Sequence, residues 1–417
     1  MKKHSARLST KLSTKTSAIT ITLHRHPLLA IGLMSGTSHD GISATLVELD
    51  ERSRPPARVI AFHTFPYPPR FRAKLLAASA DQHVGASAIS TLNFALGREL
   101  SRAAIGIARR ARIPLSAVAF IGSHGHTFFH LPPRRAARGQ LASTMQVGES
   151  AIIAAATGLP VVADFRPMDL ALGGEGAPLA PLAHLWLFPD RKRGRVVQNI
   201  GGIANATYLP PRATLGDPRL IAFDTGPGNI MIDALASRIS SGRNRMDRDG
   251  RIAARGHVNE ALLSDLIRNS YFKRRPPKST GREEFGDPLL DRIVADARRA
   301  GIDDADLLAT LTALTARSIA DACRRFIIPR GPVDQLIVTG GGARNPTLMR
   351  LLASEVRDVE VIAAANVGVD GDALEAVAFA ILAYQMLHGR QGNIPSATGA
   401  RAPAILGKLT MPPRPLE

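Results

Sequence analysis

Short apolar runs separated by turn residues open the chain, and their pattern predicts β-strands. The runs AIGLMSGTS, ISATLVELD and ARVIAFHTFPY are rich in apolar and β-branched residues and are divided by small polar residues. Three such runs in succession predict an antiparallel meander. The next stretch, STLNFALGRELSRAAIGIARRA, places Leu96, Leu100, Ala103 and Ile107 on one face of a predicted helix.

The pattern continues to about Arg166 and then starts again. AVAFIGSHGHT predicts a buried strand, ESAIIAAATG a helix and PVVADFR a strand, which completes a βββαβαβ order. RVVQNIGGIANATYL and LIAFDTGPGN repeat the strands, and helices dominate from about Ile230 to Ile327. DQLIVTGGGARNPTLMRLL predicts a strand, a glycine loop and a helix capped by Asn345, with Pro346 at its first position. The order predicts a duplicated, two-lobed α/β fold with a cleft between the lobes.

We expect four segments along the chain. Residues 1–27 carry Lys, Arg, Ser and Thr without an acidic residue, which indicates a disordered basic extension or, alternatively, a targeting signal. Residues 28–190 are expected to form the first lobe and residues 191–395 the second. Residues 396–417 are expected to return toward the first lobe.

Composition sets limits on the class of protein. The 417 residues suffice for two domains with ordinary cores. Cys323 is the one cysteine, which excludes an intrachain disulfide and a cysteine-cluster metal site. No run of apolar residues is long enough to predict a membrane span. We therefore expect a cytoplasmic protein with no membrane partner.

The net charge of +18 raises the question of nucleic acid as a partner. Aromatic residues make up only 5% of the chain, no zinc-finger spacing occurs, and the basic residues are scattered singly through predicted helices. We expect no specific nucleic-acid partner. The positive field would instead attract phosphorylated or carboxylate-bearing small molecules.

Four glycine-rich turns follow predicted strands: SGTSHDG, NIGGIAN, DTGPGN and TGGGARNP. One such turn would be only a turn, but four that also carry Ser, Thr, Asn or Asp indicate a nucleotide site. Glycine lets the backbone approach phosphate oxygens, to which exposed N–H groups donate. The chain has no GxxxxGK[ST] motif, and GGGARNP lacks the βαβ context of a dinucleotide fingerprint.

This arrangement resembles the superfamily of sugar kinases, heat-shock ATPases and actin. Within it, GLMSGTSHDGIS, GSHGHT, QVGE, ADFRPMD, GGEGAPL, QNIGGIAN, FDTGPGN, VTGGGARNP and PSATGARAP closely resemble the anhydro-N-acetylmuramic acid kinases. The resemblance spans about Gly32 to Leu409. It implies an actin-like ATPase (ribonuclease H-like) fold. It also implies an enzyme of cell-wall recycling that opens 1,6-anhydro-N-acetylmuramic acid with water and phosphorylates its O6 with ATP.

The resemblance also implies contacts of ATP with three glycine turns. The first phosphate element would comprise Gly36, Thr37, Ser38, His39, Asp40, Gly41, Ile42 and Ser43. Its partner in the second lobe would comprise Asn199, Gly201, Gly202 and Asn205, and adenosine would contact Gly340, Gly341, Gly342 and Asn345. Mg²⁺ would bridge the β- and γ-phosphates with Asp40 as its carboxylate, although an aspartate in a β-turn is more often a turn former.

The implied reaction requires one base, because the leaving O6 is itself the phosphate acceptor and needs no general acid. Asp169 is the candidate; the alternative is that it caps a following helix. Glu375 falls near the N-terminus of a predicted helix. It would either compensate the helix dipole or face the cleft and support the anomeric centre.

Sugar contacts are implied for His124, Arg166 and Gly174. The alternating histidines of GSHGHTFFH could instead suggest zinc, but no further ligand stands at a suitable spacing. The chain departs from the family at His39, Ser43, His126 and Glu175, which surround the implied phosphate and sugar sites. Two other functions stay open: a kinase of the same fold for another sugar, and a non-catalytic sugar or nucleotide sensor. The resemblance also allows a homodimer.

Overall fold

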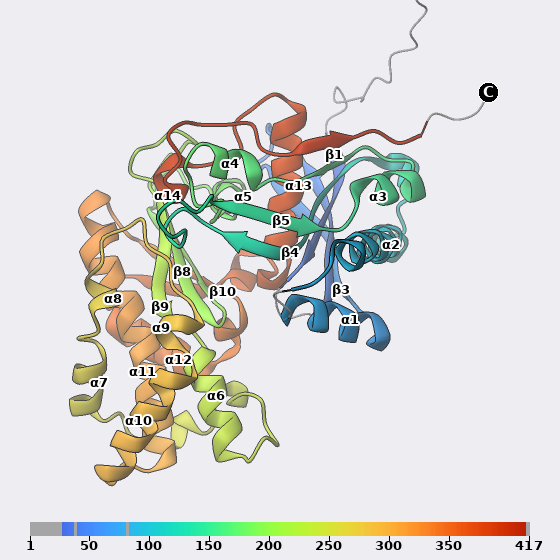
Figure 1. Ribbon diagram of the computed structural model, residues 1–417. Helices are drawn as coiled ribbons and strands as arrows, with labels where there is room; N and C mark the ends of the chain where they lie inside the picture. The colour runs from blue at the N-terminus through green and yellow to red at the C-terminus, as the bar shows by residue number, and fades with distance from the viewer. Residues whose placement is uncertain (1–26, 37–39, 81–82, 414–417) are drawn as a thin grey trace, which may run out of the picture.

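Two mixed β-sheets form the framework of the molecule (Figure 1). The computed structural model describes residues 27–36, 40–80 and 83–413. The first sheet contains β3 (Ala57–Pro66), β2 (Gly41–Leu49), β1 (Leu28–Ser35), β4 (Val118–Leu131), β6 (Val161–Ala163) and β12 (Lys408–Thr410), with β5 (Ser143–Val147) paired to β4. The second contains β9 (Ile221–Pro227), β8 (Ile203–Leu209), β7 (Arg195–Ile200), β10 (Gln335–Thr339) and β11 (Glu360–Ala363).

The two sheets share one strand order. In the first, β3, β2 and β1 are antiparallel neighbours, and β4 and then β6 continue parallel to β1. In the second, β9, β8 and β7 are antiparallel neighbours, and β10 and then β11 continue parallel to β7. Each sheet thus opens on a hairpin, and the chain returns beside the first strand. The predicted duplication of a βββαβαβ core, and with it the actin-like fold, is confirmed.

Helices separate and cover the sheets. The helices are α1 (Pro69–Ala80), α2 (Ala86–Arg110), α3 (Ser150–Thr157), α4 (Pro167–Ala171), α5 (Pro181–Leu187), α6 (Ile230–Ile239), α7 (Glu260–Leu266), α8 (Ser270–Lys273), α9 (Arg282–Phe285), α10 (Asp287–Arg299), α11 (Asp304–Ala322), α12 (Pro346–Glu355), α13 (Leu374–Leu387) and α14 (Pro395–Thr398). Shorter helical turns are η1 (Leu115–Ala117), η2 (Arg248–Gly250), η3 (Ala253–Arg255), η4 (Cys323–Ile327), η5 (Ile328–Arg330), η6 (Gly341–Arg344), η7 (Ala364–Val367) and η8 (Gly371–Ala373).

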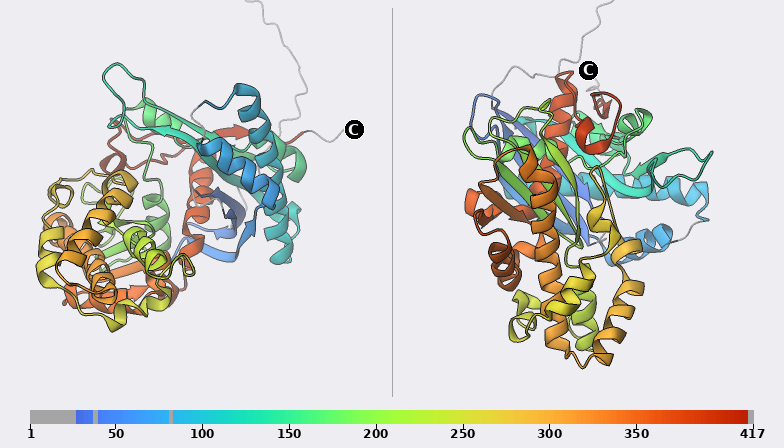
Figure 2. Two further views of the ribbon diagram at one scale, coloured as in Figure 1. Left: turned by 60° about the horizontal axis from the view of Figure 1, so that its bottom comes forward. Right: turned by 90° about the vertical axis from the view of Figure 1, so that its left-hand side faces the viewer.

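Four hydrophobic cores explain how these elements pack. One core joins α2 and α3 to the outer face of the first sheet, and another joins α11 and α12 to the outer face of the second. The third contains α5 and α13 together with residues of both sheets, so these two helices fill the space between the sheets. Helices α6 to α11 gather beside the second sheet, as Figure 2 shows in colours from yellow-green to orange, and have a core of their own.

Helix α13 lies unusually close to the first sheet. A side chain at Gly32 of β1 would collide with the backbone carbonyl of Ala376, and one at Gly122 of β4 would collide with that of Phe379. Glycine at both positions therefore allows the helix backbone to rest on the strands. Helix α13 falls within residues 191–395, the segment expected for the second lobe, yet it packs on the first sheet.

Three strands were not predicted. β5 contains polar residues and alternates between exposed and half-buried positions until the buried Val147, and β11 is a short edge strand with no buried side chain. β12 pairs antiparallel with β6, so the last described residues lie at the edge of the first sheet. The proposed segment boundaries stay predictions, and residues 1–26 lie outside the part of the chain that the structure describes.

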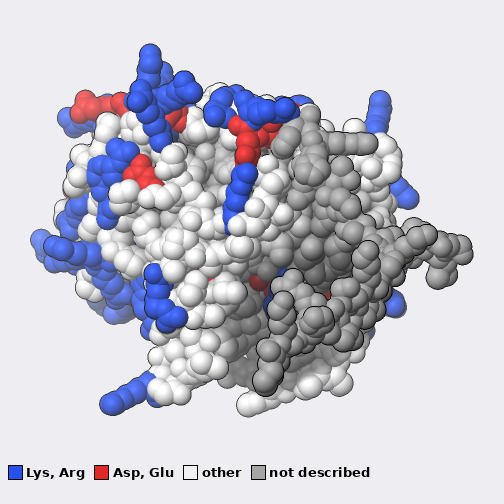
Figure 3. Space-filling view, turned by 90° about the horizontal axis from the view of Figure 1, so that it is seen from above, with Lys and Arg blue, Asp and Glu red and all other residues white. Residues whose placement is uncertain are grey.

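The surface carries the excess of basic residues. On the face shown in Figure 3, Lys and Arg side chains are spread around the rim, and a wide uncharged area separates them. The described Lys and Arg residues that are visible on that face do not form one continuous basic track of the kind common in nucleic-acid-binding proteins. Within the described residues, none of the helices combines the length and apolarity that a membrane crossing requires.

Replacing Gly32 by alanine tests the contact between α13 and the first sheet. The added methyl group must displace the helix, so we expect a loss of about 1–3 kcal/mol in the free energy of unfolding. Gly216→Ala is the matched control, because no atom lies within contact distance of a side chain there. Urea denaturation of both variants gives the comparison. Equal stability of the two variants would contradict the close packing of α13.

Candidate active site

A cleft of about 660 Å³ lies between the two lobes. Its walls come from the β1–β2 tip, the β7–β8 hairpin, the loop after β10 and the start of α13. Eleven of the residues predicted for the site line it: Gly36, Asp40, Gly41, Ser43, Arg166, Asn199, Gly201, Asn205, Gly340, Gly341 and Glu375. The structure therefore brings the three predicted glycine turns to one cavity.

The glycine turns are shaped by contacts within the second lobe. The backbone N–H groups of Gly228 and Asn229, just before α6, donate to the carbonyls of Gly202 and Gly201 at 2.9 and 2.7 Å. Gly340 has a φ of +73°, and a side chain there would approach the amide oxygen of Asn199. At these turns, backbone groups can thus face the cleft at positions where a side chain would otherwise occupy the space.

A row of polar residues crosses the second sheet at the cleft. Thr339, Asn199, Asn205 and Asp224 are register partners on β10, β7, β8 and β9, and all four line the cavity. Asp224 and Thr339 were missed as site residues. The available signal for Asp224 was its position at the start of the DTGPGN turn, and its neighbours became evident only from the strand register.

Asp169 is fully buried, and its carboxylate is held by three donors. Oδ1 accepts from the side chains of Asn393 and Thr398 at 2.9 and 2.8 Å, and Oδ2 accepts from the backbone N–H of Gly176 at 2.8 Å. A side chain at Gly174 would collide with Oδ2. Asp169 therefore lies behind the cleft wall, within the first turn of α4 rather than at its N-cap, which is Arg166.

Arg166 lines the cleft and is linked to Asp169 through the backbone of Gly176. It also contacts His124, which does not line the cleft. The Arg166 Nε donates to His124 Nε2 at 3.0 Å, and its Nη1 donates to the carbonyl of Gly176 at 2.7 Å. Since arginine only donates, His124 must carry its proton on Nδ1, which donates to the carbonyl of Gly125 at 3.1 Å. Burial, and then the charge of Arg166, lower the pKa of His124 well below its ordinary value. His124 is thus a neutral hydrogen-bonding residue.

Glu375 faces the same cleft from the first turn of α13. The Glu375 side chain opens to the cavity but is otherwise surrounded by protein. Because the surrounding protein removes water from the carboxylate, the pKa of Glu375 is raised above its ordinary value, and the charge of Arg166 opposes this rise. Burial lowers the pKa of Arg166 to about 10, and the charges of Glu375 and Asp169 oppose that shift. Arg166 therefore stays charged at neutral pH between two carboxylates.

Several predicted residues do not line the cleft. Ile42 lies in β2 and packs in the core between the first sheet and α2. Gly202 and Gly342 do not line the cleft either, and a side chain at Gly342 would collide with Ile200. The Asn345 oxygen accepts from the N–H of Leu348 at 3.0 Å, which confirms the predicted helix cap. Thr37, Ser38 and His39 lie outside the described residues. Contact of any of these residues with nucleotide stays a prediction.

Asp40 is the predicted magnesium carboxylate. Its side chain is 70% exposed, lines the cleft and lies 3.6 Å from an Nη atom of Arg72. In the described part of the chain, no three His, Cys, Asp or Glu residues are grouped as a metal site. A site of one carboxylate fits Mg²⁺ that is held mainly by phosphates and water, because Mg²⁺ keeps much of its hydration.

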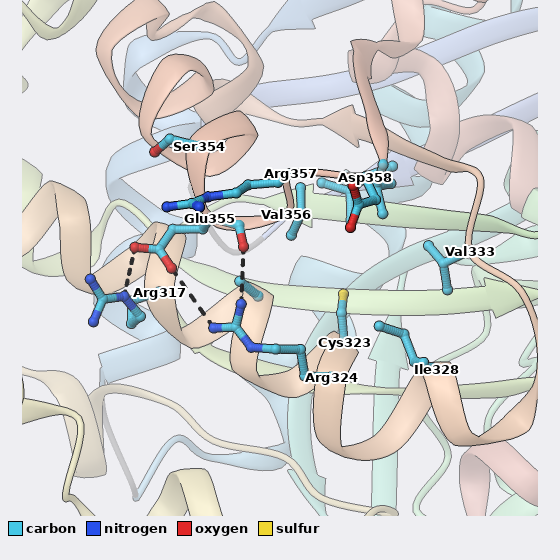
Figure 4. Close-up of a pocket in the computed structure, with 13 residues that line it drawn as sticks. Arg317, Cys323, Arg324, Ile328, Val333, Ser354, Glu355, Val356, Arg357 and Asp358 are labelled. Carbon is cyan, nitrogen blue, oxygen red and sulfur yellow. Dashed lines mark hydrogen bonds and ion pairs between the residues drawn. The ribbon is translucent and has the colours of Figure 1, made fainter.

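Another cavity, of about 630 Å³, contains none of the predicted residues. It lies beside η4 and the end of α12, where Arg317 and Arg324 are both bonded to Glu355 (Figure 4). Burial raises the pKa of the Cys323 thiol there to about 12, so this thiol is not a nucleophile at neutral pH. The cleft remains the candidate active site.

Asp224 makes stability depend on pH. Burial raises the pKa of Asp224 from its ordinary 3.8 to about 6, so the folded state binds a proton that the unfolded state has released. Stability is therefore lost as pH rises from about 4 to about 6. Asp224→Asn removes this loss. In urea denaturation across that range, we expect the free energy of unfolding of the variant to rise relative to the wild type. A difference that is constant with pH would contradict the raised pKa.

Comparisons with known proteins identify the family of this chain. The sequence profile of the Anhydro-N-acetylmuramic acid kinase family matches residues 28–412. A protein of that name from Caldanaerobacter subterraneus subsp. tengcongensis is 42% identical over 92% of this chain and 97% of its own length. Relatives of the same name from Clostridioides difficile and Microcystis aeruginosa are 39% and 40% identical over 93% and 92% of this chain, and over 99% and 100% of their own lengths. The chain belongs to the anhydro-N-acetylmuramic acid kinase family.

Proposed function

We propose that the protein converts 1,6-anhydro-N-acetylmuramic acid, water and ATP to N-acetylmuramic acid 6-phosphate and ADP. The observation that carries the proposal is the meeting of three glycine turns with Arg166 and Glu375 in one cleft, in a chain of this family. Water forms a bond to C1 while the C1–O6 bond breaks, and O6 takes the γ-phosphoryl group as ADP leaves. The proton of the water passes to a carboxylate.

ATP would lie across the turns of both lobes. Gly36 and Gly41 would face its phosphates from one side and Gly201 from the other, with Gly340 and Gly341 near adenosine. The support is that these residues line one cavity and that glycine leaves backbone N–H groups accessible to phosphate. Mg²⁺ bound to the phosphates, with Asp40 as its carboxylate, would neutralise charge that develops during transfer.

Asp169 would be the base that activates water. Its Oδ1 already accepts two hydrogen bonds, whereas Oδ2 accepts one from Gly176 and keeps a lone pair. Position 174 requires glycine, because any side chain there would collide with Oδ2. The attacking water would donate to the remaining lone pair of Oδ2. Because the carboxylate is fixed by three donors, its orientation is set before substrate binds. These contacts support the base role over the helix-capping alternative.

The sugar would lie between Asp169 and the phosphates. Arg166, His124 and Gly174 would contact it, and Glu375 would stabilise positive charge at the anomeric centre. The support is the chain of contacts from His124 through Arg166 to Gly176, together with the position of Glu375 in the cleft. We further propose that the enzyme works in the cytoplasm, where ATP is available, and that it forms a homodimer.

The variant Asp169→Asn tests the base role. Asparagine cannot take a proton from water, so we expect turnover of the anhydro sugar to fall by about a hundredfold or more, because general-base catalysis commonly contributes that much. The affinity for ATP should stay near that of the wild type, because Asp169 does not line the nucleotide cleft. Coupled ADP release measures turnover, and calorimetry measures ATP affinity.

Thr398→Val serves as the matched control for Asp169→Asn. It removes one of the three donors to the carboxylate but leaves the carboxylate itself. We expect a loss of turnover of about tenfold, as for one charge-assisted hydrogen bond. Turnover of Asp169→Asn that equals that of Thr398→Val would show that Asp169 only supports the structure.

A further inference from the structure

A smaller cavity of about 230 Å³ adjoins the cleft, and we refer to it as the side pocket. The two cavities share Ala177, Pro178 and Asp224 in their walls. Arg134 of the β4–β5 connection lines the side pocket from the first lobe, and Thr280 lines it from the second. The side pocket is therefore a lateral extension of the cleft, built from both lobes.

The loop at residues 174–178 places the side pocket next to Asp169. Gly174 and Gly176 lie against Asp169, the first by its close approach to Oδ2 and the second by its N–H group. Glu175 and Ala177, at the alternate positions, line the side pocket. One loop segment thus separates the proposed base from the side pocket. A substituent on a sugar bound at Asp169 could therefore extend into the side pocket.

The side pocket can bind an anion. Arg134 donates to Glu175 at 3.1 Å and to the carbonyl of Pro277 at 2.7 Å, so its guanidinium is fixed between the lobes. Arg135 and Lys278 add positive charge to the walls, against the carboxylates of Glu175 and Asp224. The Thr280 hydroxyl is buried without a hydrogen-bond partner. A buried hydroxyl without a partner is costly, and a ligand oxygen would satisfy it.

We infer that the side pocket binds the lactyl carboxylate of the muramic acid substrate, with Arg134 and Thr280 as its donors. This inference rests on the proposed function. The carboxylate is the group by which 1,6-anhydro-N-acetylmuramic acid differs from the corresponding anhydro-N-acetylglucosamine. Arg134 and Thr280 are therefore specificity-determining residues. Because they belong to different lobes, the carboxylate also joins the lobes around the sugar.

Two sugars and two variants test the inference. The sugars are 1,6-anhydro-N-acetylmuramic acid and 1,6-anhydro-N-acetylglucosamine, which lacks the lactyl group. The variants of the full chain are Arg134→Gln and Thr280→Val. Dissociation constants come from calorimetry, and kcat/KM comes from coupled ADP release. We expect each variant to weaken binding of the acidic sugar about tenfold or more, since hydrogen bonds to charged groups are strong. Binding of the neutral sugar should change less than about twofold.

Control variants separate charge recognition from structural effects. Arg138→Gln removes a positive charge from the same connection without lining the side pocket, and should leave both sugars unaffected. Arg134→Lys keeps the charge and should restore part of the affinity for the acidic sugar.

The inference would be overturned if the variants weakened the binding of both sugars equally or of neither sugar. It would also be overturned if the wild type bound both sugars with equal affinity. A wild type that releases no ADP with the acidic sugar would instead overturn the proposed function.

Discussion

Helix α13 packs closely on the first sheet and shares a core with the second sheet, and this packing sets the positions of the two lobes. Gly32 and Gly122 let the backbone of this helix rest on the first sheet, while residues of the second sheet join the same core from the other side. Helices α13 and α5 together thus set the separation of the sheets. The β1–β2 and β7–β8 hairpins consequently face each other across a cavity that three glycine turns can share.

Helix α13 also contributes directly to the candidate chemistry. Its first turn carries Glu375 into the cleft, and Phe379 one turn later packs against the ring of His124. His124 accepts from Arg166, which lies between the carboxylates of Glu375 and Asp169. The packing of α13 therefore determines both the arrangement of the lobes and the orientation of the site residues. A change that moved α13 would disturb both the phosphate turns and the sugar contacts.

Local sequence patterns predicted the structural features that are determined by residues close together in the chain. The hairpins, the glycine turns and the Asn345 cap were all evident from short patterns, since turn chemistry and helix capping act over a few residues. The polar row that includes Asp224 was not evident, because strand register brings its members together. The hydrogen bonds that Asn393 and Thr398 donate to Asp169 were not evident either, because these two residues lie at the far end of the chain. The side pocket joins residues of both lobes, which no local pattern reveals.

The central claim is that one site opens the anhydro ring with water and phosphorylates the oxygen that leaves. Turnover of 1,6-anhydro-N-acetylmuramic acid with ATP in oxygen-18 water tests it most directly, with the product analysed by mass spectrometry at early times. Unlabelled product incubated in the same water without enzyme corrects for exchange at the anomeric hydroxyl. We expect one label at C1 and none in the phosphate. Product that is unlabelled at C1, or labelled in its phosphate, would contradict it.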